Sequence, residues 1–389
     1  MSHQTVSIPE LVERIHRSGK HLAMVITGGG AAAISWLLTQ PGASRSILEI
    51  VVPYHDQALC EYLGHRPEQF CSLATSRALA MVGFFRARRI AGQVTNCIGL
   101  ACTASLVTDR PKRGDHRVHV AYQGETTAGS SSLVLQKGAR DRSAEDELAA
   151  RLVLWELAEA CGLEARPALP ILPGEDPQMS RVEAPTSWSA VLLGNTPFTF
   201  ARGEPAAPDL TKLAILPGSF NPFHEGHRRM IQVASRHLGR PVVLELSVIN
   251  ADKPPVDYCS LADRLAGIPA EIPVILSQAP TFAEKARLFP GCVFLVGIDT
   301  LLRIADPRFY GGSVAARDRA IKEIAEAGCR FLVFGRLIEG EFRELDSAGV
   351  PEFLRSLCQG ISESEFRMDI SSTEVRRGRG GPSQPETPN

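Results

Sequence analysis

The chain has no pair of cysteines with the spacing of a metal site. Its nine cysteines are scattered over 389 residues, and none of them forms a C-x-x-C pair. Paired spacing is typical of structural zinc sites, and an even cysteine framework is typical of small secreted domains. The sequence therefore argues against both classes. It predicts no protein-bound metal site and favours free thiols in a reducing compartment.

An excess of charge of one sign is also lacking, because 42 basic and 43 acidic residues leave a net charge of −1. Binding to nucleic acid or to anionic membranes relies on surplus positive charge, so we expect neither as a partner. No apolar run is long enough to span a bilayer. Residues 1–20 mix acids and bases and resemble neither a secretory signal nor a transit peptide. We therefore expect a cytoplasmic protein.

The length of the chain predicts two domains rather than one. Strand-like and helix-like segments alternate in residues 1–164 and again in residues 209–378, which is typical of α/β domains. Residues 165–208 contain eight prolines, each of which removes a backbone donor that a helix or central strand needs. We expect a linker there. Residues 379–389, rich in glycine and proline, are expected to form a disordered tail.

Hydrophobic periodicity predicts the individual elements. In the first region the expected strands are 21–27, 47–52, 96–101 and 118–122, and the expected helices are 9–18, 31–39, 74–88 and 144–161. In the second region the expected strands are 213–216, 242–248, 293–297 and 331–335, and the expected helices are 225–238 and 315–327.

A strand–turn–helix segment in the second region carries the strongest chemical signal. The strand ends in Pro217-Gly218-Ser219-Phe220-Asn221-Pro222, and His224 and His227 follow, three residues apart. Ligands of open α/β sheets bind at the carboxyl ends of the strands, and free N–H groups at a helix N-terminus attract phosphate. Both imidazoles could face one polyphosphate there and donate hydrogen bonds during phosphoryl transfer. A lone H-x-x-H would more simply be two incidental histidines.

The complete string resembles the first signature of the nucleotidyltransferase superfamily, a Gly-x-Phe-Asx-Pro loop followed by His-x-Gly-His. The second signature of that family, Ile-Ser-Ser-Thr-x-x-Arg, is matched from Ile370 to Arg376. The resemblance implies a Rossmann-like parallel sheet and catalytic roles for His224, His227 and Arg376. A plain helix cap would also explain the hydroxyls of the second string. The implied nucleotide-binding residues are Gly218, Ser219, Phe220, Asn221, Ser371, Ser372 and Thr373.

Three further segments resemble the nicotinamide and nicotinic acid mononucleotide adenylyltransferases. Gly297 and Asp299 match a Gly-x-Asp stretch of that subfamily, and Lys253 stands where it places a lysine near the phosphates. Phe309 and Tyr310 stand where it has aromatic residues near the pyridine ring. The resemblance implies that these five residues bind the substrate. Ordinary packing would equally explain the two aromatic residues.

The implied reaction is the transfer of AMP from ATP to a mononucleotide, with release of pyrophosphate. The acceptor phosphate is already ionised at neutral pH, so it needs no general base. Catalysis would come from positioning and charge stabilisation, with Mg²⁺ on the phosphates of ATP. Two alternatives remain open. One is adenylyl or cytidylyl transfer to another phosphorylated acceptor, such as phosphopantetheine, and the other is a nucleotide-binding sensor without turnover.

Residues 20–162 resemble the C-terminal domain of the CinA family, an α/β domain whose active members deamidate nicotinamide mononucleotide. The segments that carry this resemblance are 27–30, 41–44, 51–58 and 96–104. The serine and lysine positions of the family fall on Val25 and Leu59, whose side chains can neither attack a carbon nor move a proton. A register shifted by two residues would instead place Thr27 at the serine position. The first register implies that deamidation is lost, which leaves nucleotide binding or homo-oligomer formation as roles for this domain.

Overall fold

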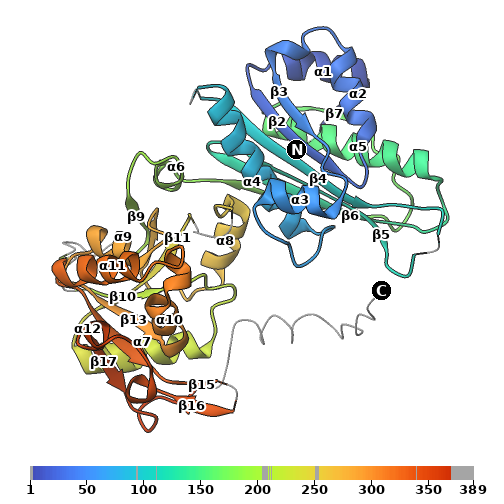
Figure 1. The fold of residues 1–389 in the computed structure, drawn as a ribbon. Helices are drawn as coiled ribbons and strands as arrows, with labels where there is room; N and C mark the ends of the chain where they lie inside the picture. Colours follow the sequence, from blue (N-terminus) through green and yellow to red (C-terminus); the bar gives the residue numbers. More distant parts are fainter. Residues whose placement is uncertain are drawn as a thin grey trace. The chain divides into compact units, whose positions relative to one another are not determined.

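The computed structural model describes residues 3–92, 95–110, 112–203, 209, 211, 213–249, 254–338 and 340–368. The expected tail, the second signature string and Lys253 lie outside the described residues. The chain divides into two compact units (Figure 1). We call Met1–Ser189 with Asp252–Ala262 the N-terminal unit, and Ala190–Ala251 with Asp263–Asn389 the C-terminal unit.

A six-stranded mixed sheet forms the centre of the N-terminal unit, in the order β3-β2-β4-β5-β6-β8. β2 pairs in parallel with β3 and β4, and the remaining pairs are antiparallel. The strands are β2 (His21–Thr27), β3 (Ile47–Val51), β4 (Cys97–Ser105), β5 (His116–Gln123), β6 (Thr127–Leu135) and β8 (Gln178–Glu183). A separate two-stranded sheet joins β1 (Gln4–Val6) to β7 (Ala165–Pro167).

Helices cover both faces of this sheet, because successive strand side chains point to opposite faces. Met24 packs in a core with residues of α1 (Ile8–His16), α2 (Ala31–Thr39) and α5 (Arg142–Ala160). Its neighbour Val25 packs in a second core with residues of α3 (Asp56–Leu63) and α4 (Leu73–Ile90). The N-terminal unit is therefore a three-layer α/β domain.

A seven-stranded sheet forms the centre of the C-terminal unit, in the order β17-β14-β13-β10-β11-β12-β9. All of its pairs are parallel except that of β9 with β12. The strands are β9 (Phe198–Arg202), β10 (Ala214–Pro217), β11 (Val242–Ser247), β12 (Val274–Ser277), β13 (Val293–Gly297), β14 (Arg330–Phe334) and β17 (Cys358–Ile361). The mostly parallel sheet confirms the predicted α/β class for this half of the chain.

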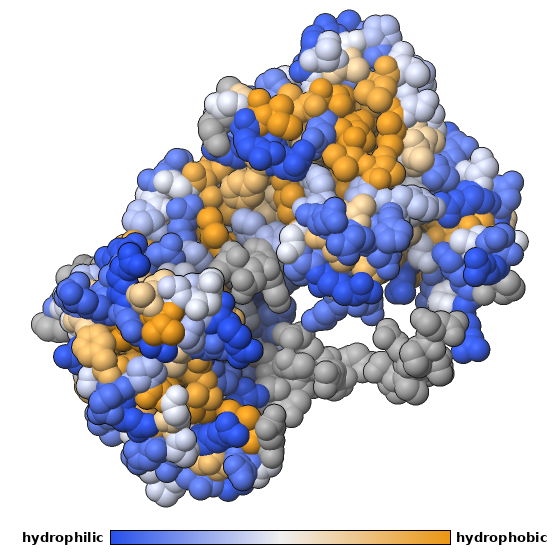
Figure 2. Space-filling model, viewed as in Figure 1, coloured by the Kyte–Doolittle hydropathy of each residue, from blue (hydrophilic) through white to orange (hydrophobic). Residues whose placement is uncertain are grey.

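Helices alternate with the parallel strands, as the sequence predicts. They are α7 (Glu225–Leu238), α8 (Tyr258–Ala266), α9 (Phe282–Leu288), α10 (Ile298–Ala305), α11 (Val314–Glu326) and α12 (Glu352–Arg355). A small hairpin, β15 (Arg336–Ile338) with β16 (Glu341–Arg343), follows β14. None of the helices in the described part of the chain is long and apolar enough to cross a bilayer. Apolar and hydrophilic side chains are interspersed on the visible surface of each unit (Figure 2).

The proline-rich stretch 165–208, expected to be a linker, contains regular elements. β7, β8, α6 (Thr186–Leu192) and β9 lie within it. β8 and β9 each lie at the edge of one of the two large sheets. Proline is tolerated at an edge strand because one side of that strand forms no hydrogen bonds within the sheet. Pro177 precedes β8, Pro185 precedes α6 and Pro197 precedes β9, so none of these three elements contains a proline. The prolines delimit these elements instead of preventing them.

Candidate active site

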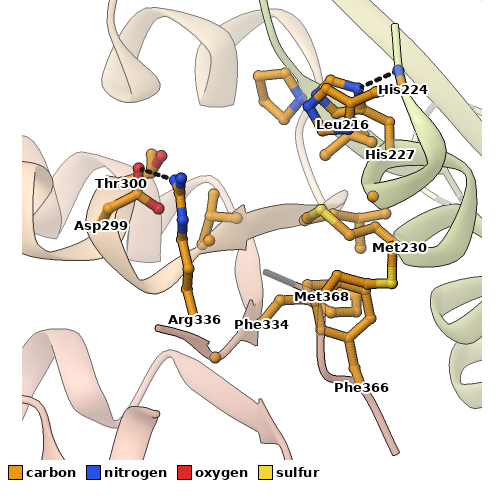
Figure 3. A pocket seen from close by; sticks show the side chains of 16 residues that line it. Leu216, His224, His227, Met230, Asp299, Thr300, Phe334, Arg336, Phe366 and Met368 are labelled. Carbon is orange, nitrogen blue, oxygen red and sulfur yellow. Dashed lines mark hydrogen bonds and ion pairs between the residues drawn. The ribbon is translucent and has the colours of Figure 1, made fainter. Parts of the chain in front are cut away.

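The candidate site lies where the strand order of the C-terminal sheet reverses. β10 is flanked by β11 on one side and by β13 on the other. The chain therefore adds β11 and β12 on one side of β10, and then β13 and β14 on the other side. In open α/β sheets such a switch point leaves a crevice at the carboxyl ends of the strands. A cavity of about 530 Å³ lies there, bordered by the ends of β10, β13 and β14 and by the start of α7 (Figure 3).

Two stacked histidines form one wall of this cavity. His224 is the N-cap residue of α7 and His227 lies one turn further, so both rings lie at the helix start. The ring centroids are 3.7 Å apart, with an angle of 24° between the planes. The ring of Phe220 packs edge-on against His227 and that of Phe223 stacks on it. Aromatic packing therefore fixes the orientation of the imidazole pair.

Burial keeps both imidazoles neutral. It lowers the pKa of His227 to about 3, with a further contribution from His224. The pKa of His224 is lowered by burial and, to a smaller extent, by the positive charge of Arg336. The backbone N–H of His224 donates to Nδ1 of His227 at 3.2 Å, so the neutral ring carries its proton on Nε2. His227 can therefore act as a hydrogen-bond donor to a ligand without becoming charged.

The loop before the histidines is shaped by Gly218 and Phe220. The Gly218 N–H donates to the carbonyl of Glu245 at 3.0 Å, so it is not free for a ligand. A Cβ atom on Gly218 would lie 2.9 Å from the ring of Phe220, which is buried and has a φ of 45°. Ser219 and Asn221 are exposed. These four residues form the loop beside the cavity but do not line it.

The Gly297–Asp299 segment, predicted to bind the substrate, lines the opposite wall of the cavity. Gly297 is the N-cap residue of α10, and Asp299 lies in the first turn, where a carboxylate is favoured by the helix dipole. Nη1 of Arg336 lies 3.7 Å from Oδ2 of Asp299 (Figure 3). Both side chains are partly exposed, so the attraction between them is modest. A guanidinium in this position can also bind phosphate.

Sequence reasoning missed Arg336 and the apolar part of the cavity. Phe334 and Phe366 pack edge to face, with ring centroids 4.9 Å apart. Together with Met230 and Met368 they line the cavity (Figure 3). Apolar and aromatic side chains of this kind suit the flat ring of a base. The one available signal for Arg336 was its position just after the end of a predicted strand.

Of the remaining predicted site residues, the two that the structure describes, Phe309 and Tyr310, do not line this cavity. Phe309 is half exposed, and the guanidinium of Arg303 lies over its ring at 4.8 Å. The hydroxyl of Tyr310 donates to the carbonyl of Ile304 at 3.1 Å. Neither aromatic residue lines the cavity, which favours the packing interpretation of this pair. Lys253 and the clamp residues Ser371, Ser372, Thr373 and Arg376 lie outside the described residues.

The glycine-rich turn of the N-terminal unit is closed by an internal carboxylate. Asp146 accepts hydrogen bonds from the backbone N–H groups of Gly30, Ala31 and Ala32, at 2.8, 3.3 and 3.2 Å. These are the donors at the start of α2 that an anion would otherwise use. A phosphate therefore has to compete with Asp146 at this turn.

Comparisons with known proteins agree with the geometry of the C-terminal unit. Residues 215–378 match the family model described as "Cytidylyltransferase-like". The chain is also 26% identical over 179 residues to a "Putative nicotinamide mononucleotide adenylyltransferase" of Schizosaccharomyces pombe, a match that covers 42% of this chain and 68% of that protein.

Solved structures of two bacterial proteins are similar to part of the chain. The competence/damage inducible protein CihA of Agrobacterium tumefaciens is 19% identical, with a TM-score of 0.34, over 41% of this chain and 99% of that chain. A competence-damaged protein (CinA) superfamily protein of Escherichia coli is 17% identical, with a TM-score of 0.33, over 39% of this chain and 90% of that chain. The family match and the stacked histidine pair within it identify residues 215–378 as a cytidylyltransferase-like nucleotidyltransferase domain.

Proposed function

We propose that the C-terminal unit transfers AMP from ATP to nicotinamide or nicotinic acid mononucleotide and releases pyrophosphate. The observation that carries the proposal is the stacked, neutral pair His224 and His227 in a cavity at the switch point of the sheet. The opposite wall carries Asp299, in the Gly-x-Asp stretch that resembles the pyridine mononucleotide adenylyltransferases. The relative from Schizosaccharomyces pombe, which is named as a putative nicotinamide mononucleotide adenylyltransferase, supports the same acceptor class.

The reaction is an in-line displacement. An oxygen of the acceptor phosphate attacks the α-phosphorus of ATP, the new P–O bond forms, and the bond to the bridging oxygen breaks, so that pyrophosphate leaves with its electrons. Negative charge develops on the oxygens of the transferred group. The Nε2–H of His227 would donate to that charge, and Arg336 would add a charged donor. No proton has to be removed from the attacking phosphate.

Mg²⁺ would enter as part of the ATP complex. Asp299 is the one carboxylate among the residues that line the cavity. Within the described ranges, no group of three or more His, Cys, Asp or Glu side chains could hold a metal ion. This donor set fits a magnesium ion held mainly by phosphate oxygens and water, with at most one protein carboxylate. The ion would neutralise charge on the leaving pyrophosphate.

A pyrophosphate-release assay tests the proposal directly. ATP and CTP are each incubated with Mg²⁺ and one of four acceptors: nicotinamide mononucleotide, nicotinic acid mononucleotide, phosphopantetheine or a phosphorylated lipid precursor. We expect release with ATP and a pyridine mononucleotide, and none from a His224→Asn/His227→Asn variant. Release only with another acceptor or with CTP would replace the proposed substrates. ATP binding without release from any acceptor would instead indicate a nucleotide sensor.

A further inference from the structure

One internal segment of the transferase sequence belongs to the N-terminal unit. The family match runs without interruption over residues 215–378, and Asp252–Ala262 falls inside it. By its contacts, however, this segment forms one compact body with Met1–Ser189. It includes the first five residues of α8, and the rest of that helix is grouped with the C-terminal unit.

Tyr258 attaches this segment to the turn between β5 and β6. Its backbone N–H donates to Oε1 of Gln123 at 3.3 Å, and its hydroxyl donates to the carbonyl of Glu125 at 2.7 Å. The side chain of Gln123 is fully buried, and its Nε2 donates to the carbonyl of Gly124 at 2.8 Å. The buried amide group thus has partners at both ends. Loss of either partner would leave a desolvated polar group, which is costly.

Apolar burial reinforces these hydrogen bonds. Val256, Tyr258, Cys259 and Leu261 are each at most 6% exposed. Asp257 accepts from the backbone N–H of Ser260 at 2.9 Å and so caps the start of α8. Four buried apolar side chains on one short segment are typical of a permanent core rather than of a transient contact. The grouping of the segment with the N-terminal unit thus rests on its contacts and on the hydrogen bonds of Tyr258, and its apolar side chains are buried.

We propose that the N-terminal unit is an intramolecular support of the transferase domain: it binds residues 254–262 through Gln123 and Glu125 and thereby completes the transferase fold. This role needs no chemistry in the N-terminal unit, and it accounts for a domain that keeps an intact core while its expected catalytic positions are aliphatic. Tyr258 and Gln123 are positioning residues. The consequence for turnover rests on the proposed function, whereas the binding of the segment does not.

Hydrogen–deuterium exchange on the full chain tests the support. We expect Gln123→Ala and Tyr258→Phe each to speed exchange of peptides covering residues 254–266 about tenfold, the effect of one lost buried hydrogen bond. Peptides of β2, in the same unit, should be unaffected. Tyr122→Phe is the matched control, since Tyr122 is a buried tyrosine of β5 whose hydroxyl has no hydrogen-bond partner among the described residues. Unchanged exchange at 254–266 in both variants would overturn the proposal.

Pyrophosphate release by the same proteins supplies the second readout. We expect it to fall at least fivefold in Gln123→Ala and Tyr258→Phe and to be kept in Tyr122→Phe, on the scale of one lost hydrogen bond. Faster exchange at 254–266 together with full turnover overturns a supporting role. If the parent protein releases no pyrophosphate with any acceptor, the proposed function fails, and the exchange measurement alone decides whether the N-terminal unit holds the segment.

Discussion

Lys285 on α9 and Glu245 on β11 form a buried ion pair, and Glu245 is also hydrogen-bonded through its backbone to the loop of the first signature. Nζ of Lys285 lies 2.8 Å from each carboxylate oxygen of Glu245 and 2.6 Å from the carbonyl of Ala279. Ser277 donates its hydroxyl to the same carboxylate. The backbone carbonyl of Glu245 accepts the N–H of Gly218. The ion pair therefore holds the strand against which the loop is hydrogen-bonded.

Removal of one partner of this pair should be strongly destabilising. Lys285→Met leaves the carboxylate of Glu245 buried without its cation, which costs about 3–5 kcal/mol of the free energy of unfolding. The double variant Glu245→Gln/Lys285→Met should recover part of that loss, because no charge is then left unpaired. Urea unfolding measures both. The control is Lys322→Met, since Lys322 is largely exposed and its pair with Glu326 should contribute less than about 1 kcal/mol. Equal effects of the two lysine variants would contradict this account.

His227→Ala should lower turnover by about two to three orders of magnitude, the scale of losing one preorganised donor to a developing oxyanion. The fold should be kept, because the ring is only partly buried at the edge of the cavity. Steady-state pyrophosphate release and circular dichroism measure the two effects. His237→Ala removes an exposed histidine from the last turn of the same helix and should leave turnover unchanged. Turnover of His227→Ala within a few-fold of the parent would remove His227 from the mechanism.

The stability of the protein should fall with decreasing pH in a way that His227 partly determines. Its pKa is about 3 in the folded state, below the ordinary value of 6.5. As the pH falls from 6.5 towards 3, the unfolded chain therefore binds a proton that the folded chain excludes. The free energy of unfolding then decreases by up to about 1.4 kcal/mol per pH unit for this proton.

Urea unfolding between pH 6.5 and 4.5 tests this dependence by comparing the parent protein with His227→Gln. We expect a shallower pH dependence in the variant, because its side chain does not titrate. Burial also lowers the pKa of His119, to about 4, but that contribution is common to both proteins. Parallel curves for the two proteins would show that His227 is freely protonated in the folded state.

Local patterns in the sequence predicted much of the fold. The helix 225–238 and the strand 293–297 have the expected bounds, because each has a regular apolar pattern between glycine or proline residues. α3 and β6 were missed for physical reasons. α3 has only eight residues, and β6 contains the serines 130–132, whose burial depends on pairing with β5 and β8 rather than on their own hydrophobicity.

The candidate site could be predicted only where it is local in sequence. His224 and His227 share one helix start, so their spacing alone places them together. Arg336 follows β14, Met230 lies on α7 and Phe366 follows β17, so only the folded sheet and its helices bring the three residues to one cavity. The hydrogen bond between Tyr258 and Gln123 joins positions far apart in the chain, so the local hydrophobic pattern of the sequence cannot predict it.

Arg376 remains a prediction from the second signature. We expect Arg376→Ala to raise the KM for ATP and to slow the reaction, because a charged donor to the triphosphate is lost. Initial rates over a range of ATP concentrations measure both effects. Arg377→Ala removes the same charge from the neighbouring position and serves as the control. Overlapping ATP titrations of Arg376→Ala and the parent would assign Arg376 a structural role.

The N-terminal unit should release no ammonia from nicotinamide mononucleotide. Val25 and Leu59, at the serine and lysine positions of the CinA resemblance, are buried in the same apolar cluster. In the shifted register, Thr27 would be the nucleophile, but its hydroxyl donates to the carbonyl of Pro53 at 3.1 Å. Nδ1 of His55, the nearest alternative base in the sequence, accepts the backbone N–H of Gln57 at 3.1 Å. In the first register no hydroxyl is present, and in the shifted register the hydroxyl of Thr27 donates to a carbonyl oxygen rather than to a base.

A coupled ammonia assay with the purified full chain measures this directly, and we expect a rate equal to that of buffer with the substrate alone. Thr27→Ala and Thr39→Ala form a matched pair, since Thr39 carries an exposed hydroxyl at the end of α2 and has no place in either register. Ammonia release that Thr27→Ala abolishes and Thr39→Ala leaves intact would show that the Thr27 hydroxyl leaves Pro53 to attack the substrate. The chain would then combine a deamidase with its transferase domain, and the N-terminal unit would have kept its chemistry with threonine as the nucleophile.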